Sequence, residues 1–181
     1  MLTDFRKRKL IALFNLYDVN KNGFLEQADY EQVGQNLTTT LNLQPGSPES
    51  TRLYAQPMSS WNTIYQLCGA PSNQRVTQEE YLAALDQLLS DKNNYHAIVG
   101  NWTDSIIRLS DRDGDGRLSQ QEIVANGRSY NVDEATTNEA FRRLDQDGDG
   151  YLTREEILRS VEEFFYSEDP QAPGNWLFGP D

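Results

Sequence analysis

Apolar residues recur at helical spacing in several segments of this chain. One helix face, with apolar residues at i, i+3, i+4 and i+7, ends just before Asp18. Similar faces end before Asp111 and Asp145, and further apolar faces follow the acidic segments that begin there. The recurring unit is therefore helix, short acidic loop, helix. This pattern predicts an all-α fold of four helix–loop–helix units in two paired lobes, packed into one compact protein.

Breaks in the pattern suggest how the chain is divided. Residues 1–92 are expected to form an N-terminal pair of units, residues 93–166 a C-terminal pair, and residues 167–181 an apolar tail that packs on the core. The tail contains Trp176 and Phe178, which would be costly to leave in water. Pro57 lies inside a helical stretch and predicts a kink or a helix end near Gln56.

Two twelve-residue segments, 111–122 and 145–156, have an oxygen ligand at every diagnostic position of a calcium-binding loop. Calcium is a hard cation that takes six to eight oxygens, and carboxylates at positions 1, 3, 5 and 12 supply most of them. Glycine at position 6 lets the backbone reverse, so that the carbonyl of residue 7 can also coordinate. The alternative, an acidic turn between helices, is disfavoured because the pattern occurs twice between amphipathic helices. The predicted ligands are Asp111, Asp113, Asp115, Arg117, Ser119, Glu122, Asp145, Asp147, Asp149, Tyr151, Thr153 and Glu156.

Segment 18–29 is a modified version of the same loop. It has amides at positions 3 and 5, and aspartate instead of glutamate at position 12. Asp29 is one methylene shorter than glutamate, and ligation through one oxygen suits Mg²⁺ better than Ca²⁺. We expect weaker binding here, or lower selectivity for Ca²⁺ over Mg²⁺, and an empty loop remains an alternative. The predicted ligands are Asp18, Asn20, Asn22, Phe24 (through its carbonyl), Glu26 and Asp29.

The second unit has the frame of such a loop without its ligands. With Val76 aligned to the apolar position 8, position 1 is Gly69, position 3 is Pro71 and position 6 is Gln74. An ion would find almost no oxygen ligands there. We expect this loop to serve as a packing partner, with Val76 opposite Leu25.

Charge and composition exclude several classes of function. A net charge of −12 would repel nucleic acids and anionic membranes, so neither is expected as a partner. Cys68 is the single cysteine, which excludes an intramolecular disulfide and a thiolate metal site. No segment is long and apolar enough to span a bilayer, and no secretory signal is recognisable, so a cytoplasmic setting is expected. No constellation of residues indicates an enzyme.

Together, these motifs resemble the four-EF-hand sarcoplasmic calcium-binding proteins and their bacterial relatives of the calerythrin type. The resemblance covers nearly the whole chain. It rests on loops one, three and four, the decayed second loop, the long insert between the first two units, and the tail segment 173–179. It implies a compact protein with both lobes folded together, and a role as a calcium buffer.

The leading functional hypothesis is therefore a monomeric calcium buffer or transporter with no obligatory protein target. Its ions would be Ca²⁺ at loops three and four, and Ca²⁺ or Mg²⁺ at loop one. One alternative is a calcium sensor that exposes a groove to a protein target. Sensor grooves tend to be rich in methionine, whereas this chain has only Met1 and Met58. Another alternative is an EF-hand protein that binds a small apolar ligand.

Overall fold

The computed structural model describes residues 1–179, and within them the fold is all-α apart from four very short strands. A capping side chain starts most of the helices, as Thr3 does for the first and Ser47 for the third. The helices are α1 (Asp4–Tyr17), α2 (Gln27–Thr40), α3 (Pro48–Leu67), α4 (Gln78–Ser90), α5 (Tyr95–Ser110), α6 (Gln120–Ser129), α7 (Glu134–Leu144) and α8 (Arg154–Tyr166), with 3₁₀ turns η1 (Lys92–Asn94) and η2 (Pro173–Trp176).

The strands join the loops in pairs. β1 (Phe24–Glu26) runs antiparallel to β2 (Arg75–Thr77), which places Leu25 opposite Val76 and confirms that predicted pairing. β3 (Leu118–Ser119) and β4 (Tyr151–Leu152) pair in the same way. The apolar residues that pair across the strands, Leu25 with Val76 and Leu118 with Leu152, are completely or almost completely buried. Loop one is therefore fixed to loop two, and loop three to loop four.

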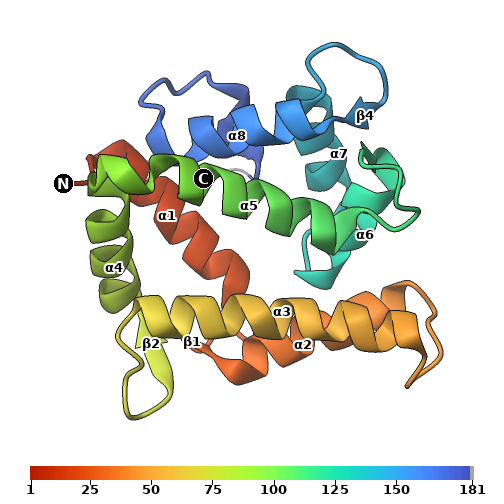
Figure 1. The fold of residues 1–181 in the computed structure, drawn as a ribbon, viewed down its shortest axis with the longest axis horizontal. Helices are drawn as coiled ribbons and strands as arrows, with labels where there is room; N and C mark the ends of the chain where they lie inside the picture. The colour runs from red at the N-terminus through yellow and green to blue at the C-terminus, as the bar shows by residue number, and fades with distance from the viewer. Residues whose placement is uncertain (180–181) are drawn as a thin grey trace.

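The helices enclose one continuous core. In Figure 1, α2 and α3 lie side by side beneath α5, while α8 lies above α5, and α1 crosses between these levels. α2 also packs against α6, so the first and second halves of the chain are in direct contact. The core cluster takes residues from both halves, including Leu10, Tyr81, Val99 and Phe164. The helices contain no segment that is both long and apolar enough to cross a membrane within residues 1–179.

Of the kink or helix end predicted near Gln56, the helix end is wrong, because α3 continues through Pro57 to Leu67. Proline removes one hydrogen bond within the helix. Here the tertiary contacts outweigh that loss, since Pro57 lies on the same buried face as Leu53, Trp61 and Ile64. Burial of this face stabilises the helix on both sides of the proline.

The end of the described chain is tied to the first helix. Lys9 is only 1% exposed, and its Nζ donates to the carbonyls of Glu163 and Ser167 and to Asn175 Oδ1, at 3.0–3.1 Å. η2 packs on α8, where Gly174 approaches so closely that a Cβ would lie 2.5 Å from the Ser160 carbonyl oxygen. Residues 180 and 181 of the predicted tail lie outside the described residues.

Candidate metal sites

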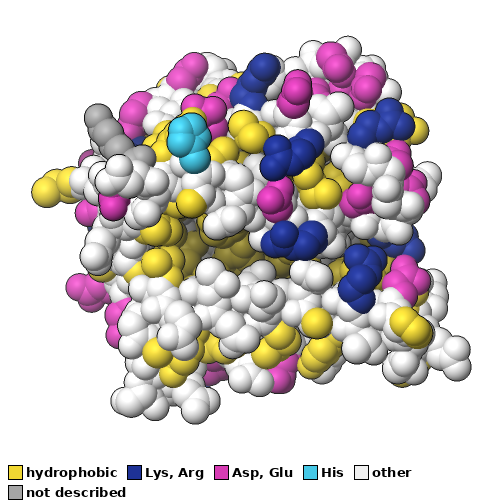
Figure 2. Space-filling model, viewed as in Figure 1, with side chains coloured by type: hydrophobic (Ala, Val, Ile, Leu, Met, Phe, Trp, Pro, Cys, Tyr) yellow, Lys and Arg dark blue, Asp and Glu magenta, His cyan; other side chains and the backbone are white. Residues whose placement is uncertain are grey.

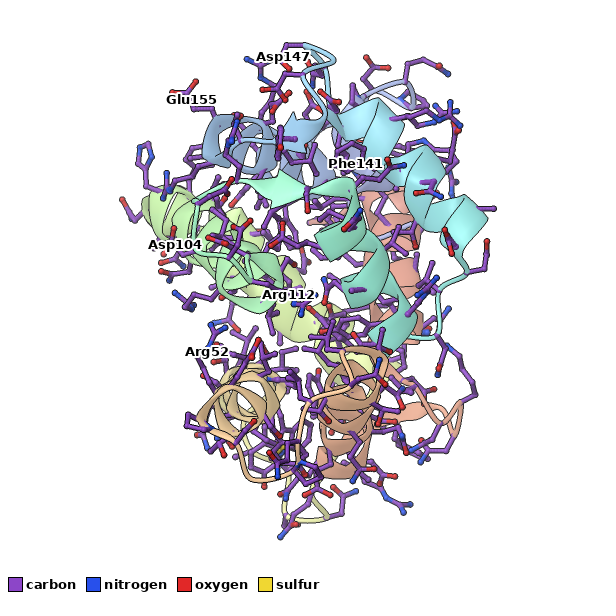
Figure 3. All side chains as sticks on the ribbon, turned by 90° about the vertical axis from the view of Figure 1, so that its right-hand side faces the viewer. Arg52, Asp104, Arg112, Phe141, Asp147 and Glu155 are labelled. Atoms are coloured by element: carbon purple, nitrogen blue, oxygen red, sulfur yellow. The ribbon has the colours of Figure 1, made fainter. Side chains whose placement is uncertain are left out.

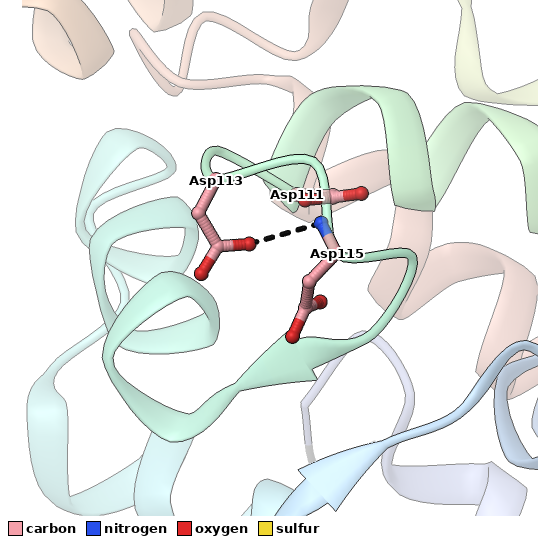
Figure 4. Close-up of side chains that lie close together, drawn as sticks. All are labelled: Asp111, Asp113 and Asp115. Carbon is pink, nitrogen blue, oxygen red and sulfur yellow. Dashed lines mark hydrogen bonds between the residues drawn. The ribbon is translucent and has the colours of Figure 1, made fainter.

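Loop three brings together carboxylates that lie apart along its backbone. One carboxylate oxygen from each of Asp111, Asp113 and Asp115 lies within 4.8 Å of the others. Figure 4 shows the three side chains around the loop, with an Asp113 oxygen accepting a hydrogen bond from the Asp115 backbone. Gly116, at position 6, has a φ of +80°, which places it in the left-handed region that glycine adopts without strain. The sharp reversal there allows the acidic side chains to converge.

Backbone N–H groups orient these carboxylates. Asp111 accepts from the N–H groups of Gly114 and Gly116, at 2.7 and 3.1 Å. Asp115 Oδ1 accepts from the backbone of Arg117 at 2.8 Å. These hydrogen bonds fix the positions of the carboxylate oxygens within the loop.

Loop four also brings three carboxylates together, but from positions 1, 3 and 12. One oxygen from each of Asp145, Asp147 and Glu156 lies within 4.8 Å of the others. Asp145 accepts from Gly148 and Gly150 at 2.9 and 3.1 Å, as its counterpart does in loop three. The fourth carboxylate of this loop, Asp149, accepts from the backbone of Tyr151 at 2.9 Å.

The glutamates at position 12 have a second role, because each lies at the third position of the following helix. Ser119 caps α6 and Thr153 caps α8, and each accepts from the N–H of the glutamate while the glutamate accepts in return. These reciprocal bonds form a capping box. Glu122 and Glu156 are also held by the backbone N–H groups of Arg112 and Gln146, at 2.7 and 3.0 Å.

The capping box and the hydrogen bond from Gln146 affect the ionisation of Glu156. Burial acts to raise the pKa of its carboxyl group, but the hydrogen bonds from Thr153 and from the backbone of Gln146 outweigh burial and lower that pKa. The carboxylate is accordingly charged at neutral pH. At position 7 of the two loops, the guanidinium carbon of Arg117 lies over the ring of Tyr151, 4.1 Å from the ring centroid.

The donor sets of loops three and four fit a hard divalent cation. All the clustered atoms are carboxylate oxygens, which Ca²⁺ prefers, and neither nitrogen nor sulfur is among them. Each trio leaves out one of the four carboxylates predicted for its loop: Glu122 in loop three and Asp149 in loop four.

Loop one has the same backbone with a different arrangement of side chains. Asp18 and Asp29 are buried, and Asp18 accepts from the N–H groups of Asn22 and Gly23 at 3.1 and 2.9 Å. The amide oxygen of Asn20 accepts from the Asn22 backbone, and the amide oxygen of Asn22 accepts from the backbone of Phe24. Within residues 1–179, no trio of acidic groups converges in this loop as it does in loops three and four.

Asp29 and Glu26, the other acidic residues of loop one, are engaged with protein partners. The Asp29 oxygens accept from the backbone N–H groups of Asn20 and Glu26, at 3.3 and 3.0 Å. Burial raises the pKa of Asp29, the hydrogen bonds from Glu26 and Asn20 lower it, and the charges of Asp18 and Glu26 raise it, so that the pKa is raised on balance. Glu26 Oε1 accepts from the amide of Asn22 at 2.7 Å, and its Oε2 pairs with Arg75 Nε at 3.0 Å.

Arg75 is a neighbour of loop one that was not predicted from the sequence. It lies in the decayed second loop, and the strand register places it directly opposite Glu26. The predicted pairing of Leu25 with Val76 already implied this neighbour, since adjacent residues in antiparallel strands pair in reverse order. The second loop thus introduces a cation beside the first loop.

The second loop keeps its shape without glycine at position 6. Gln74 occupies that position with a φ of +58°, in the left-handed region. Glu80, at position 12, accepts from the backbone and hydroxyl of Thr77 at 2.8 Å, and hydrogen bonds from these two groups lower its pKa. No acidic trio forms there either, in the part of the chain that the structure describes.

A family model for the EF-hand domain matches residues 137–165, which span most of α7, loop four and most of α8. Calerythrin of Saccharopolyspora erythraea is 23% identical over 168 residues, covering 92% of this chain and 95% of that protein. The sarcoplasmic calcium-binding protein beta chain of Penaeus sp. is 26% identical over 177 residues, covering 91% and 90% of the two chains. Among solved structures, the calcium-loaded apo form of the coelenterazine-binding protein from Renilla muelleri has a TM-score of 0.82 at 21% identity, covering 99% of this chain and 100% of that chain.

The paired loops, the acidic clusters and these matches define an EF-hand calcium-binding protein. Within that class, the chain is similar over most of its length to calerythrin and to a sarcoplasmic calcium-binding protein. The family model and the two sequence relatives concern calcium-binding proteins and indicate no catalytic family.

Proposed function

We propose that this protein is an intracellular calcium buffer without catalytic activity. Two Ca²⁺ ions would bind at loops three and four through the ligands predicted from the sequence. A third ion, Ca²⁺ or Mg²⁺, would bind more weakly at loop one. The convergence of acidic oxygens in loops three and four supports the first two sites. The engagement of Glu26 by Arg75 supports weaker binding at the third.

The packing of the tail favours a buffer over a sensor. Phe178 lies against Phe164 and Trp102, with ring centroids 4.8 and 5.7 Å apart. The guanidinium carbon of Arg143 lies over the ring of Trp176, 4.1 Å from the ring centroid. A sensor offers its apolar groove to a partner helix. Here the chain's own aromatic residues cover apolar surface between α5, α7 and α8.

Hydrogen exchange separates these two roles. For a buffer, calcium should increase the protection of residues 173–179 and α8, because the bound ion stabilises the folded state. A sensor would instead release this segment, so faster exchange there on addition of calcium would contradict the proposal.

Calorimetry with and without millimolar Mg²⁺ should find two tight calcium sites whose affinity persists in Mg²⁺ and a third site whose affinity for calcium falls in Mg²⁺.

A cavity favours a second candidate function, the binding of a small, largely apolar ligand. The cavity has a volume of about 750 Å³ and lies between the two halves of the chain, with walls from α3, α5 and α6. This volume falls within the range of roughly 300–1,000 Å³ that is usual for ligand pockets. A lipophilic fluorescent probe that bound with 1:1 stoichiometry would support this function. The function would be excluded if no such probe bound.

A further inference from the structure

The cavity opens on the face of the molecule shown in Figure 2. A hollow with a hydrophobic floor lies between the upper and lower layers, and Lys and Arg side chains stand near its right-hand part. Polar side chains of α3 and α5, such as Ser60 and Ser105, line the cavity together with apolar residues. Leu118 and Leu152, from the strands that join loops three and four, also contribute to the lining.

The charges of the lining differ sharply from those of the protein as a whole. The sequence contains 28 acidic residues and has a net charge of −12. Nevertheless, among the described residues no aspartate or glutamate lines the cavity, and the single charged residue of the lining is Arg108. An uncompensated cation at an apolar cavity attracts an anionic group of a ligand.

The positive charge of Arg108 is not cancelled by a neighbouring acid. Its Nη2 donates to the neutral hydroxyl of Ser105 at 2.9 Å, and within residues 1–179 no ion pair includes it. Asp104, one helical turn earlier, instead accepts from Arg154 at 2.8 Å. Figure 3 shows two further exposed arginines, Arg52 and Arg112, near the boundary between the α2–α3 pair and the layer above it.

The cavity walls also contain polar atoms that lack a protein partner. The hydroxyl of Tyr81 and the amide oxygen of Asn126 are both buried without a hydrogen-bond partner among the described residues. A buried polar atom left without a hydrogen-bond partner destabilises the folded state. A ligand with a polar group along its body, or water entering beside it, would recover part of this cost.

We propose that the cavity binds an amphipathic organic carboxylate, with its apolar body among the helices and its carboxylate on the guanidinium of Arg108. This inference rests on the ligand-binding function proposed above. Arginine suits this role because its planar fork can bind a carboxylate through two hydrogen bonds. A polyanion such as a nucleotide fits less well, because the lining offers one cation and the whole protein repels negative charge. The ligand class is therefore a monoanion with a long apolar or aromatic body.

A matched pair of probes tests the role of charge. 11-(Dansylamino)undecanoic acid and its methyl ester share one fluorescent apolar body and differ only in the carboxylate. Titrated into the calcium-loaded protein, the acid should bind with 1:1 stoichiometry and about tenfold more tightly than the ester, the factor expected when a charge-assisted hydrogen bond is lost.

Four variants locate the carboxylate and the body of the probe. Arg108→Gln should weaken binding of the acid about tenfold and leave the ester unchanged, whereas Arg108→Lys should retain much of the preference for the acid. Arg142→Gln removes the same charge from an exposed position on α7 outside the lining, and should change neither affinity. Ser60→Phe narrows the cavity from a half-buried position and should weaken both probes. Thermal melts of the calcium-loaded variants establish that each is folded.

The outcomes distinguish two kinds of failure. If acid and ester bind equally and Arg108→Gln has no effect, the carboxylate proposal fails while the ligand-binding function stands. If neither probe binds, or if both bind at many sites unaffected by Ser60→Phe, both proposals fail. A preference for the acid that Arg142→Gln reduces as much as Arg108→Gln does would show attraction by overall charge, and would also overturn the assignment of Arg108.

Discussion

The N-terminal and C-terminal loop pairs have the same backbone frame, but they differ in what they offer an ion. Each pair is joined by a short antiparallel strand pair with a buried apolar centre, and each has left-handed residues at position 6. Loops three and four fill this frame with converging carboxylates. In the N-terminal pair, Glu26 of loop one is paired with Arg75 of loop two. Strand pairing and the left-handed residue at position 6 thus maintain the same frame in both pairs, although the ligands differ.

Removing calcium should have the largest effect on this comparison. Each occupied site stabilises the fold by about 2.7 kcal/mol when the free ion is at 100 times its dissociation constant. Removal of both C-terminal ions by a chelator should therefore lower the free energy of unfolding by roughly 5 kcal/mol. Without the ions, the clustered carboxylates also repel one another. Thermal unfolding with and without chelator measures this effect. If the chelator left the melting temperature unchanged, the result would contradict the prediction that loops three and four bind ions that stabilise the fold.

Substitutions at position 12 should each eliminate one C-terminal site. Glu122→Gln or Glu156→Gln retains the side-chain length but removes a charged ligand. The affinity of that loop should fall by about 100-fold or more, because loss of even an outer-shell partner costs about 10–100-fold. Calorimetry should show one tight site fewer. Glu155→Gln, at the exposed neighbouring position, is the control and should leave the stoichiometry unchanged.

Loop one should respond to a change in loop two. Arg75→Gln removes the cation beside Glu26 and frees its carboxylate. Calcium affinity at loop one should rise by up to about fivefold, since partly exposed ion pairs contribute about 0.2–1 kcal/mol. Calcium titrations of Arg75→Gln in a Glu122→Gln/Glu156→Gln background isolate this weaker site. Arg128→Gln, which removes an exposed ion pair between α6 and α7, is the matched control for the change in charge. An unchanged affinity for Arg75→Gln would show that Arg75 does not restrain loop one.

The smallest effect is expected in the second loop. Gln74 has a left-handed conformation that costs a non-glycine residue about 1–2 kcal/mol. Gln74→Gly should relieve this cost. The greater entropy of glycine in the unfolded chain offsets part of the gain, so the net increase in stability should be less than about 1 kcal/mol. Urea unfolding measures the gain. The variant should bind no additional calcium, because the loop still lacks ligands, and a new calcium site would show that ligand number is not what separates the two pairs.

The features that sequence predicted well are local ones. A calcium loop is a twelve-residue pattern, and its helices show their buried faces as periodic apolar residues, so the loops and the all-α fold could be predicted together. The features that sequence did not predict depend on tertiary contacts. Burial against other helices carries α3 through Pro57, and strand register brings Arg75 to Glu26. The cavity around Arg108 is formed by segments widely separated along the chain. No single segment encodes such features.

The buried ammonium of Lys9 has a consequence for synthesis of the protein. Its three acceptors lie 154–166 residues further along the chain. At about 5–20 residues per second, translation separates Lys9 from these acceptors by roughly 8–30 s. During that interval α1 can emerge and form helical turns, but these three acceptors have not yet been synthesised. The first helix of this protein therefore reaches its final environment only when the ribosome has made the tail.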